Sequence, residues 1–420
     1  MQRRVPPALV ALVSLWTAGC FEATSADPWS ETDDGDGDGE DEASDAATGS
    51  EAGSEADDGA DEDATSGSSS TTATSETGDG DADGDGDGDG DGDGDGDGDG
   101  CVNSLPTFTS IPTYLSGTGL YANIDQHLVS DLVDHYRPQF ELWTDAAVKS
   151  RWLYIPECAQ IDTLAMGAWN FPVGTRVWKE FLVEGDPNQG IPDKRIETRL
   201  ITRTGPGPDD WAFATYVWNE TETEATLMIG GVENARGTNH DVPSQEQCLQ
   251  CHGGLGAAMG GTPSRLNGVS AVQLGFESEL LDLQDLVDDQ KITHAPAHAV
   301  VLPPSLDGAA RPALGMLHAN CGHCHNSTGF GHNYLNFDLT LKPGDGIVEQ
   351  TSAYLTTVGV PTMGFTEVAY RIDPGSLENS AMWIRDSARG DAAQMPPLGT
   401  EVPDDHALDL LEAWIMELGG

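Results

Sequence analysis

The chain of 420 residues is strongly acidic, with 71 Asp and Glu residues against 19 Lys and Arg residues and a formal net charge of −52. The excess persists in residues 101–420, where 41 acidic residues oppose 17 basic ones. This charge repels nucleic acids and anionic surfaces, so we expect neither as a partner. It suits docking with a basic partner protein.

Residues 1–20 have the pattern of an export signal, in which two arginines precede a mostly apolar run too short to span a bilayer comfortably. The run closes on Thr-Ala-Gly-Cys at Cys20, which resembles a bacterial lipobox, although Thr17 replaces the usual Leu. An ordinary secretory signal with an incidental Cys20 is the alternative. Because Phe21 rather than Asp follows the cysteine, we expect a lipid anchor in the outer membrane, with the protein facing the periplasm or the cell surface.

Residues 21–100 hold 30 acidic residues and no Lys or Arg, and the tract ends in almost pure Asp-Gly alternation. Such a segment cannot bury apolar area and repels itself, so the sequence predicts a disordered linker. A flexible chain of this length has an end-to-end distance of roughly 50 Å. The alternating Asp residues match half of a calcium-binding loop. Gly stands where that loop needs its bidentate Glu, so we do not expect calcium binding here.

A C-x-x-C-H pentapeptide occurs twice, at residues 248–252 and 321–325. This is the attachment signature of c-type haem, in which two thiols bond the porphyrin covalently and the histidine ligates the iron. The alternatives are zinc sites and structural disulfides. Zinc pairs usually lie within about 20 residues of each other, whereas about 70 separate these two. The sequence predicts two covalent haems, with these attachment residues and iron ligands: Cys248, Cys251, His252, Cys321, Cys324 and His325.

Two cysteines remain, Cys101 and Cys158. In an oxidising compartment such a pair favours a disulfide, and two unpaired thiols are the alternative.

Residues 101–240 read as a β-rich domain. Strands are predicted at 176–183, 195–202 and 211–218, separated by turns that are rich in Pro, Gly and Asn. This spacing is typical of an antiparallel sandwich or a barrel-like domain. In the preceding segment, Asp145, Lys149 and Arg151 could line a site, although a salt-bridged surface is the commoner explanation for such a group.

From residue 241 short helical stretches and loops replace the strands. Residues 241–310 form the first haem-binding segment, in which His252 is the expected proximal ligand. The second axial position of this haem is left open between Met259, His294, His298, another residue, or no protein ligand.

Residues 311–420 have the pattern of a class I cytochrome c domain. A helix at 315–323 is expected to deliver the second motif, and the apolar stripe at 406–418 predicts a C-terminal helix that packs across it. Met395 lies between them in a Met-Pro-Pro loop, where class I cytochromes place the second axial ligand. His/Met ligation fills both axial sites and favours electron transfer over oxygen chemistry.

Most of residues 105–418 resembles the exported bacterial dihaem c-type cytochromes that have a β-rich N-terminal region. The resemblance rests on LWTDAAVK at 142–149, FPVGT at 171–175, ETRL at 197–200, YVWN at 216–219, QCLQCH at 247–252, LN at 266–267, LHANCGHCH at 317–325 and MPP at 395–397. It implies covalent haem, a periplasmic or surface location and a redox role. Ala146 stands where the family usually has Gly, and Met259 and His294 do not match family positions.

The expected fold is therefore a multidomain α+β chain: a disordered acidic linker, a β-rich sandwich-like domain and a mainly α-helical cytochrome c region. The expected function is electron transfer by two haems at the cell envelope, with a redox protein as partner. One alternative is a dihaem oxidoreductase of peroxidase type, with an open site on the first haem. Another is a surface module whose β domain binds a ligand or a polysaccharide.

Overall fold

The computed structural model describes the following residues: 104–252, 266, 268–275, 279–296, 308–327, 329 and 335–420. All of them belong to one unit of the chain, Asp91–Gly420. The predictions on the signal peptide with Cys20, the linker at 21–100, Cys101, Met259 and His298 lie outside the described residues. Among those that are described, no helix is both long and apolar enough to cross a membrane.

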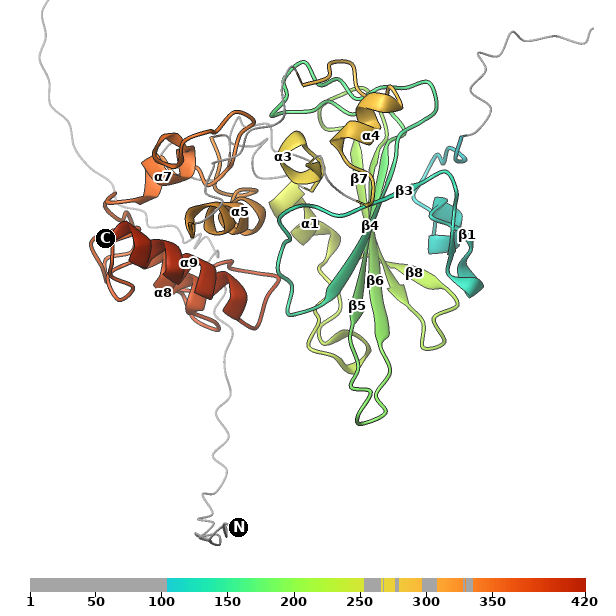
Figure 1. The fold of residues 1–420 in the computed structure, drawn as a ribbon. Coiled ribbons are helices and arrows are strands. Elements are labelled where there is room, and N and C mark those ends of the chain that lie inside the picture. Colours follow the sequence, from blue (N-terminus) through green and yellow to red (C-terminus); the bar gives the residue numbers. More distant parts are fainter. Residues whose placement is uncertain are drawn as a thin grey trace, which may run out of the picture. The chain divides into compact units, whose positions relative to one another are not determined.

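The main element is a six-stranded antiparallel sheet whose strands follow one another in chain order (Figure 1). Its strands are β3 (Asp134–Tyr136), β4 (Val148–Tyr154), β5 (Arg176–Val183), β6 (Lys194–Arg203), β7 (Trp211–Trp218) and β8 (Ala225–Met228). The three predicted strands are confirmed as β5, β6 and β7. With the helices that follow, this sheet confirms a mixed α and β fold with a β-rich region.

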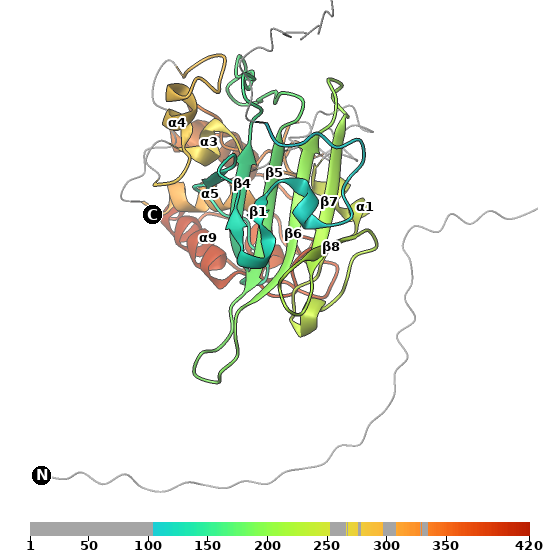
Figure 2. The ribbon, with the colours of Figure 1, turned by 90° about the vertical axis from the view of Figure 1, so that its right-hand side faces the viewer.

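One face of the sheet is apolar along its length. Trp152 of β4, Trp178 of β5 and Leu200 of β6 pair across the strands and are buried in one cluster. The chain before β3 covers this face, as Figure 2 shows for β1. That cover consists of η1 (Leu115–Thr118), β1 (Tyr121–Asn123), η2 (Ile124–Gln126) and β2 (Leu128–Val129), with β1 and β2 paired as a second, two-stranded sheet.

The opposite face changes character along the strands. Near one end it is apolar, where Leu153, Val177 and Ile201 pack with the short helices α3 (Ala271–Leu274) and α4 (Leu283–Asp288). Two residues further along each strand this apolar row gives way to charged side chains, because alternate residues of a strand face the same side.

The C-terminal part consists of helices around a separate apolar cluster. Its elements are α5 (Ala310–Asn320), η4 (Val348–Gln350), α7 (Ser352–Thr357), α8 (Ala381–Ser387) and α9 (Asp405–Leu418). Helix α9 begins where the side chain of Asp404 accepts hydrogen bonds from the first backbone N–H groups. Its stripe of Leu411, Trp414 and Ile415 is buried against α5, which confirms the predicted C-terminal helix and its packing partner.

Helix α5 differs in its bounds from the predicted 315–323. It begins at Ala310 and ends at Asn320, so the second motif lies in the turn after the helix and not within its last residues. The reason is local: the N–H groups of Cys321 and Gly322 both donate to the carbonyl of Leu317, at 2.9 and 3.0 Å, and this closes the helix.

Candidate functional site

The first C-x-x-C-H motif occupies the C-terminal half of α1 (Gln245–His252). The helix begins with a capping box, in which Ser244 Oγ accepts from the Gln247 N–H at 3.2 Å and Gln247 Oε1 accepts from the Ser244 N–H at 2.8 Å. Helix α1 packs against β7, where the ring of His252 stacks on Phe213 with centroids 5.8 Å apart. Both cysteines and the histidine are half-buried, so the motif lies against the sheet.

The second motif forms a tight turn directly after α5. The N–H of His325 donates to the carbonyl of Cys321 at 2.8 Å, which brings the histidine back beneath the end of the helix. Glycine is required between the cysteines, because a Cβ on Gly322 would lie 2.7 Å from the carbonyl oxygen of His318. The backbone of the turn therefore depends on residues inside the motif.

An aromatic ring supports the imidazole of His325. The centroid of the Phe337 ring lies 4.6 Å from that of the imidazole. The guanidinium of buried Arg371 lies 4.7 Å from the centroid of the same Phe337 ring. Burial lowers the pKa of His325 to about 4, and the charges of Arg385 and Arg371 act in the same direction. The imidazole is therefore neutral at pH 7 and keeps a lone pair for a metal.

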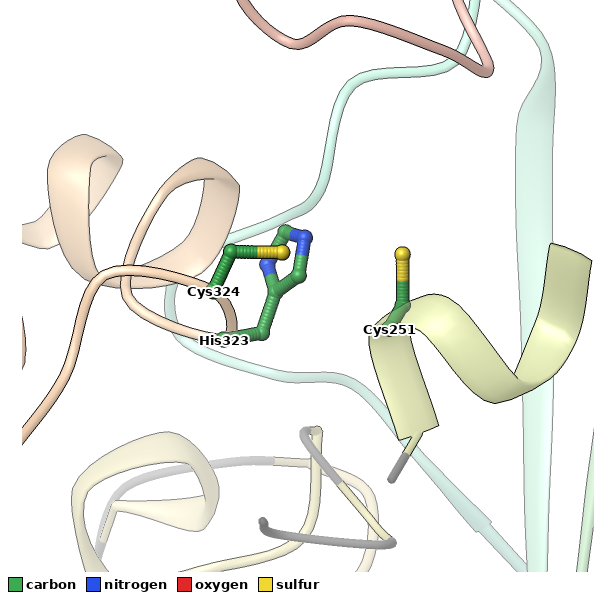
Figure 3. Close-up of side chains that lie close together, drawn as sticks. All are labelled: Cys251, His323 and Cys324. Carbon is green, nitrogen blue, oxygen red and sulfur yellow. The ribbon is translucent and has the colours of Figure 1, made fainter. Parts of the chain in front are cut away.

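The two motifs converge on each other (Figure 3). Cys251 of the first motif and His323 and Cys324 of the second have donor atoms that all lie within 4.8 Å of one another. The Cys324 thiol interacts with Cys251 as a donor, which lowers the pKa of Cys251 and raises that of Cys324. Two sulfurs and one imidazole nitrogen at this separation match the donor set of soft transition metals.

A row of cations crosses the sheet on the face that carries α1. Arg151 of β4, Lys179 of β5 and Arg199 of β6 are direct cross-strand neighbours, and Thr215 of β7 completes the row. Neighbouring strands are about 4.8 Å apart, so three like charges lie side by side. Burial raises the pKa of the Cys248 thiol, and the nearby charge of Arg199 opposes this rise, so the row lies close to the first motif.

The two ends of this row are paired differently within the described residues: Arg199 is hydrogen-bonded to an acid, whereas Arg151 lies 3.6 Å from Glu141. Arg199 Nε donates to Glu197 Oε2 at 3.0 Å, and Glu197, which is fully buried, also contacts His240 Nε2 at 2.7 Å. Burial raises the pKa of Glu197, but Arg199 and His240 outweigh it, so this pKa lies below its usual value. Burial lowers the pKa of Lys179 well below 10.5, and the neighbouring arginines add to the effect.

Met395 lies in a half-buried loop that is tied to α8. Its N–H donates to the carbonyl of Arg385 at 2.9 Å, and Arg385 Nε donates to the carbonyl of Ala393 at 2.9 Å. The charge of Arg385 lowers the pKa of His325, so this arginine links the Met395 loop with the surroundings of the second motif. Met395 as an iron ligand stays a prediction.

Of the candidate second ligands for the first haem, the structure describes only His294. His294 is exposed, and its hydrogen bonds within the described part of the chain are to Thr293 and Thr163. Cys158 forms a disulfide, while the cysteines of the two motifs are thiols. The partner of Cys158 is thus outside the described residues, and its pairing with Cys101 stays a prediction.

Asp145 connects the strand region to the C-terminal part. Its carboxylate accepts hydrogen bonds from the backbone of Glu401 and Val402 at 3.0 and 2.9 Å. The next residue, Ala146, has φ 60, a conformation that favours glycine, and this is the position where the resemblance expects glycine. Asp145 therefore has a structural partner and is not a free site residue.

Comparison of the chain with known proteins gives no match to a family model, a curated protein or a solved structure.

Sequence reasoning missed two parts of this site. His323 is one of the variable residues of the pentapeptide and carries no signal of its own, yet it joins Cys251 and Cys324. Of the cation row, only Arg151 was among the predicted site residues. A detectable signal was present, since Lys179 and Arg199 each stand two residues from an apolar residue on the same face of a predicted strand.

Proposed function

We propose that this protein is a dihaem c-type cytochrome that transfers electrons at the cell envelope. The observation that carries the proposal is the pair of C-x-x-C-H motifs, one in the last turns of α1 and one in the turn after α5, with Cys251 of the first close to Cys324 of the second. The neutral imidazole of His325 supports the same function, because iron binding requires the unprotonated nitrogen.

The residues present fit the cofactor by their donor chemistry. Each motif offers two thiols for thioether bonds and one imidazole for the iron, and Met395 would serve as the second axial ligand of the second haem. When bound, haem supplies one-electron redox chemistry. The chain would attach the porphyrins, shield His325 behind Phe337, and hold the two cofactors near each other, which supports electron exchange between them.

The finer organisation belongs to the same proposal. We infer a β-rich domain at 101–240, a first haem segment at 241–310 and a cytochrome c domain at 311–420, which the contact between α5 and α9 supports. The acidic tract would tether this body to a lipid on Cys20 in the outer membrane. A basic redox protein would be the partner, because the chain has a net charge of −52.

The test is haem stoichiometry in protein matured by a host with a c-type attachment system. Intact mass and pyridine haemochrome spectra should give two covalent haems per chain, and one in Cys321→Ala/Cys324→Ala. The matched control is His323→Gln, which changes a variable residue of the same motif and should retain both haems. A wild-type chain with no added haem mass would refute the proposal.

A second candidate follows from the convergence of Cys251, His323 and Cys324, which would also suit a zinc ion shared by the two segments. The same variants separate the two functions. Zinc bound at one equivalent in wild type, lost in His323→Gln, and accompanied by no haem would favour the metal centre. Retention of two haems in His323→Gln would exclude it as the main function.

A further inference from the structure

In the row formed by Arg151, Lys179 and Arg199, both arginines share their acidic partner with another basic side chain, and Lys179 has no ion pair among the described residues. Arg151 is 4% exposed, makes no hydrogen bond among the described residues, and has its Nη1 atom 3.6 Å from Glu141. Glu141 is itself bonded to Arg137 at 2.7 Å. An arginine that is buried without a hydrogen-bonded partner is costly, so an acceptor that pairs with it would stabilise the fold.

Lys179 lacks an acidic partner among the described residues. Within the described residues its ammonium makes no ion pair, and its Nζ lies 4.8 Å above the ring of Phe181. The guanidinium of Arg199 lies 4.3 Å from the same ring. Lys179 is half-buried, and burial is the main cause that lowers its pKa.

A neutral donor extends the row toward α1. The hydroxyl of Thr215 is buried and interacts with the thiol of Cys248. Thr215 is the direct neighbour of Arg199 on β7, the strand against which α1 packs. Arg151 Nη1, a buried donor without a hydrogen bond among the described residues, therefore marks one end of the row, and Thr215 Oγ1, beside Cys248, marks the other. Glu141 and Glu197 pair with the two arginines of the row, and each also contacts a basic side chain outside it.

We propose that Arg151, Lys179, Arg199 and Thr215 form a carboxylate-binding site beside the first C-x-x-C-H motif. Arginine and lysine bind carboxylates through charge-assisted hydrogen bonds, and a hydroxyl can donate one more. One source of the carboxylate is the pair of propionate groups of the haem on the first motif, and this assignment rests on the proposed function. The other source is a free small carboxylate bound next to the motif, which does not rest on it.

The experiment uses the full mature chain and three substitutions: Lys179→Met, Lys179→Arg and Arg151→Met. Lys179→Met removes a desolvated charge without orphaning an acidic partner, so the variant is expected to fold. The matched control is Arg137→Gln, which removes an arginine that contacts Glu141 but is 73% exposed and lies outside the row. For each protein the covalent haem mass, the midpoint potentials, the propionate bands in resonance Raman spectra and acetate binding are measured.

If the haem propionates occupy the row, Lys179→Met and Arg151→Met keep two haems, lower one midpoint potential and shift the propionate bands. Lys179→Arg and Arg137→Gln stay close to wild type, and wild type shows no saturable acetate binding. If a free carboxylate is the ligand, wild type binds acetate saturably and Lys179→Met loses at least tenfold in affinity.

The two proposals fail separately. Wild type without haem refutes the cytochrome, while the acetate titration of the same chain still decides on the row. Two attached haems with unchanged potentials and Raman bands in both methionine variants, together with no acetate binding, overturn the carboxylate-binding site and leave the cytochrome intact.

Discussion

The carboxylate of Asp145 accepts a hydrogen bond of 2.9 Å from the hydroxyl of Thr400, 255 residues further along the chain. The same carboxylate accepts the N–H groups of Glu401 and Val402. These bonds connect the segment before β4 to the loop that follows Met395. Asp145 therefore holds the C-terminal loop against the strand region together with Trp143, whose Nε1 donates to the carbonyl of Val402 at 2.9 Å.

Replacement of Asp145 by Ala should lower the free energy of unfolding by about 1–3 kcal/mol, because three donors lose a charged acceptor. Urea denaturation measures this change. Asp131→Ala, at an exposed turn position without a side-chain hydrogen bond among the described residues, should change it by less than about 0.5 kcal/mol. Equal effects of the two substitutions would argue against a special role for Asp145.

Gly315 should not tolerate alanine, although alanine is the better helix former by about 1 kcal/mol. A Cβ at this position of α5 would lie 2.1 Å from Cε1 of Phe140, so the ring or the helix must move. We expect Gly315→Ala to cost about 1–3 kcal/mol in thermal or urea unfolding. Gly230→Ala is the control, because nothing lies within 4 Å of its added Cβ. A stabilised Gly315→Ala would show that the contact with Phe140 is loose.

His318 should make the fold sensitive to acid. Burial lowers its pKa to about 4, below the ordinary 6.5, and its Nδ1 accepts the N–H of Leu341 at 3.1 Å. The unfolded chain therefore binds the proton more readily than the folded one between pH 6.5 and 4, so this contribution to stability is present above pH 6.5 and is lost as the pH falls.

The substitution His318→Asn keeps an acceptor for Leu341 but cannot be protonated. It should remove up to about 3 kcal/mol of the stability difference between pH 7 and pH 4. Unfolding curves at several pH values test this, with the exposed His406→Gln as control. An unchanged pH slope in His318→Asn would mean that another group causes the acid sensitivity.

Substitution of Glu197 should strongly lower the free energy of unfolding. It has no exposed surface and joins Arg199 to His240. Glu197→Gln would leave the guanidinium of Arg199 without its counter-charge, at a cost of about 3–5 kcal/mol for a broken buried pair. Chemical denaturation provides the measurement, and Glu220→Gln, whose side chain is 85% exposed, provides the control. A loss below about 1 kcal/mol would show that the pair is already solvated.

Elements that depend on a local residue pattern could be predicted from the sequence alone. Strands β5 and β7 have the predicted bounds because β-branched and aromatic residues alternate within them, and α9 follows from its apolar stripe and the acceptor at Asp404. The two C-x-x-C-H motifs could also be recognised in the sequence, because each motif consists of five consecutive residues. The end of α5 was less predictable, because the hydrogen bonds to Leu317 and not residue type close that helix.

Which residues come into contact depends on the tertiary structure. Arg151, Lys179 and Arg199 become neighbours through the register of three strands, and a shift of one residue would turn each of them to the other face. Cys251 and His323 approach through the packing of separate helices, which no local periodicity encodes. The sequence gives the chemical type of each side chain, whereas the distances between side chains arise from long-range strand pairing and burial. The candidate site depends on both.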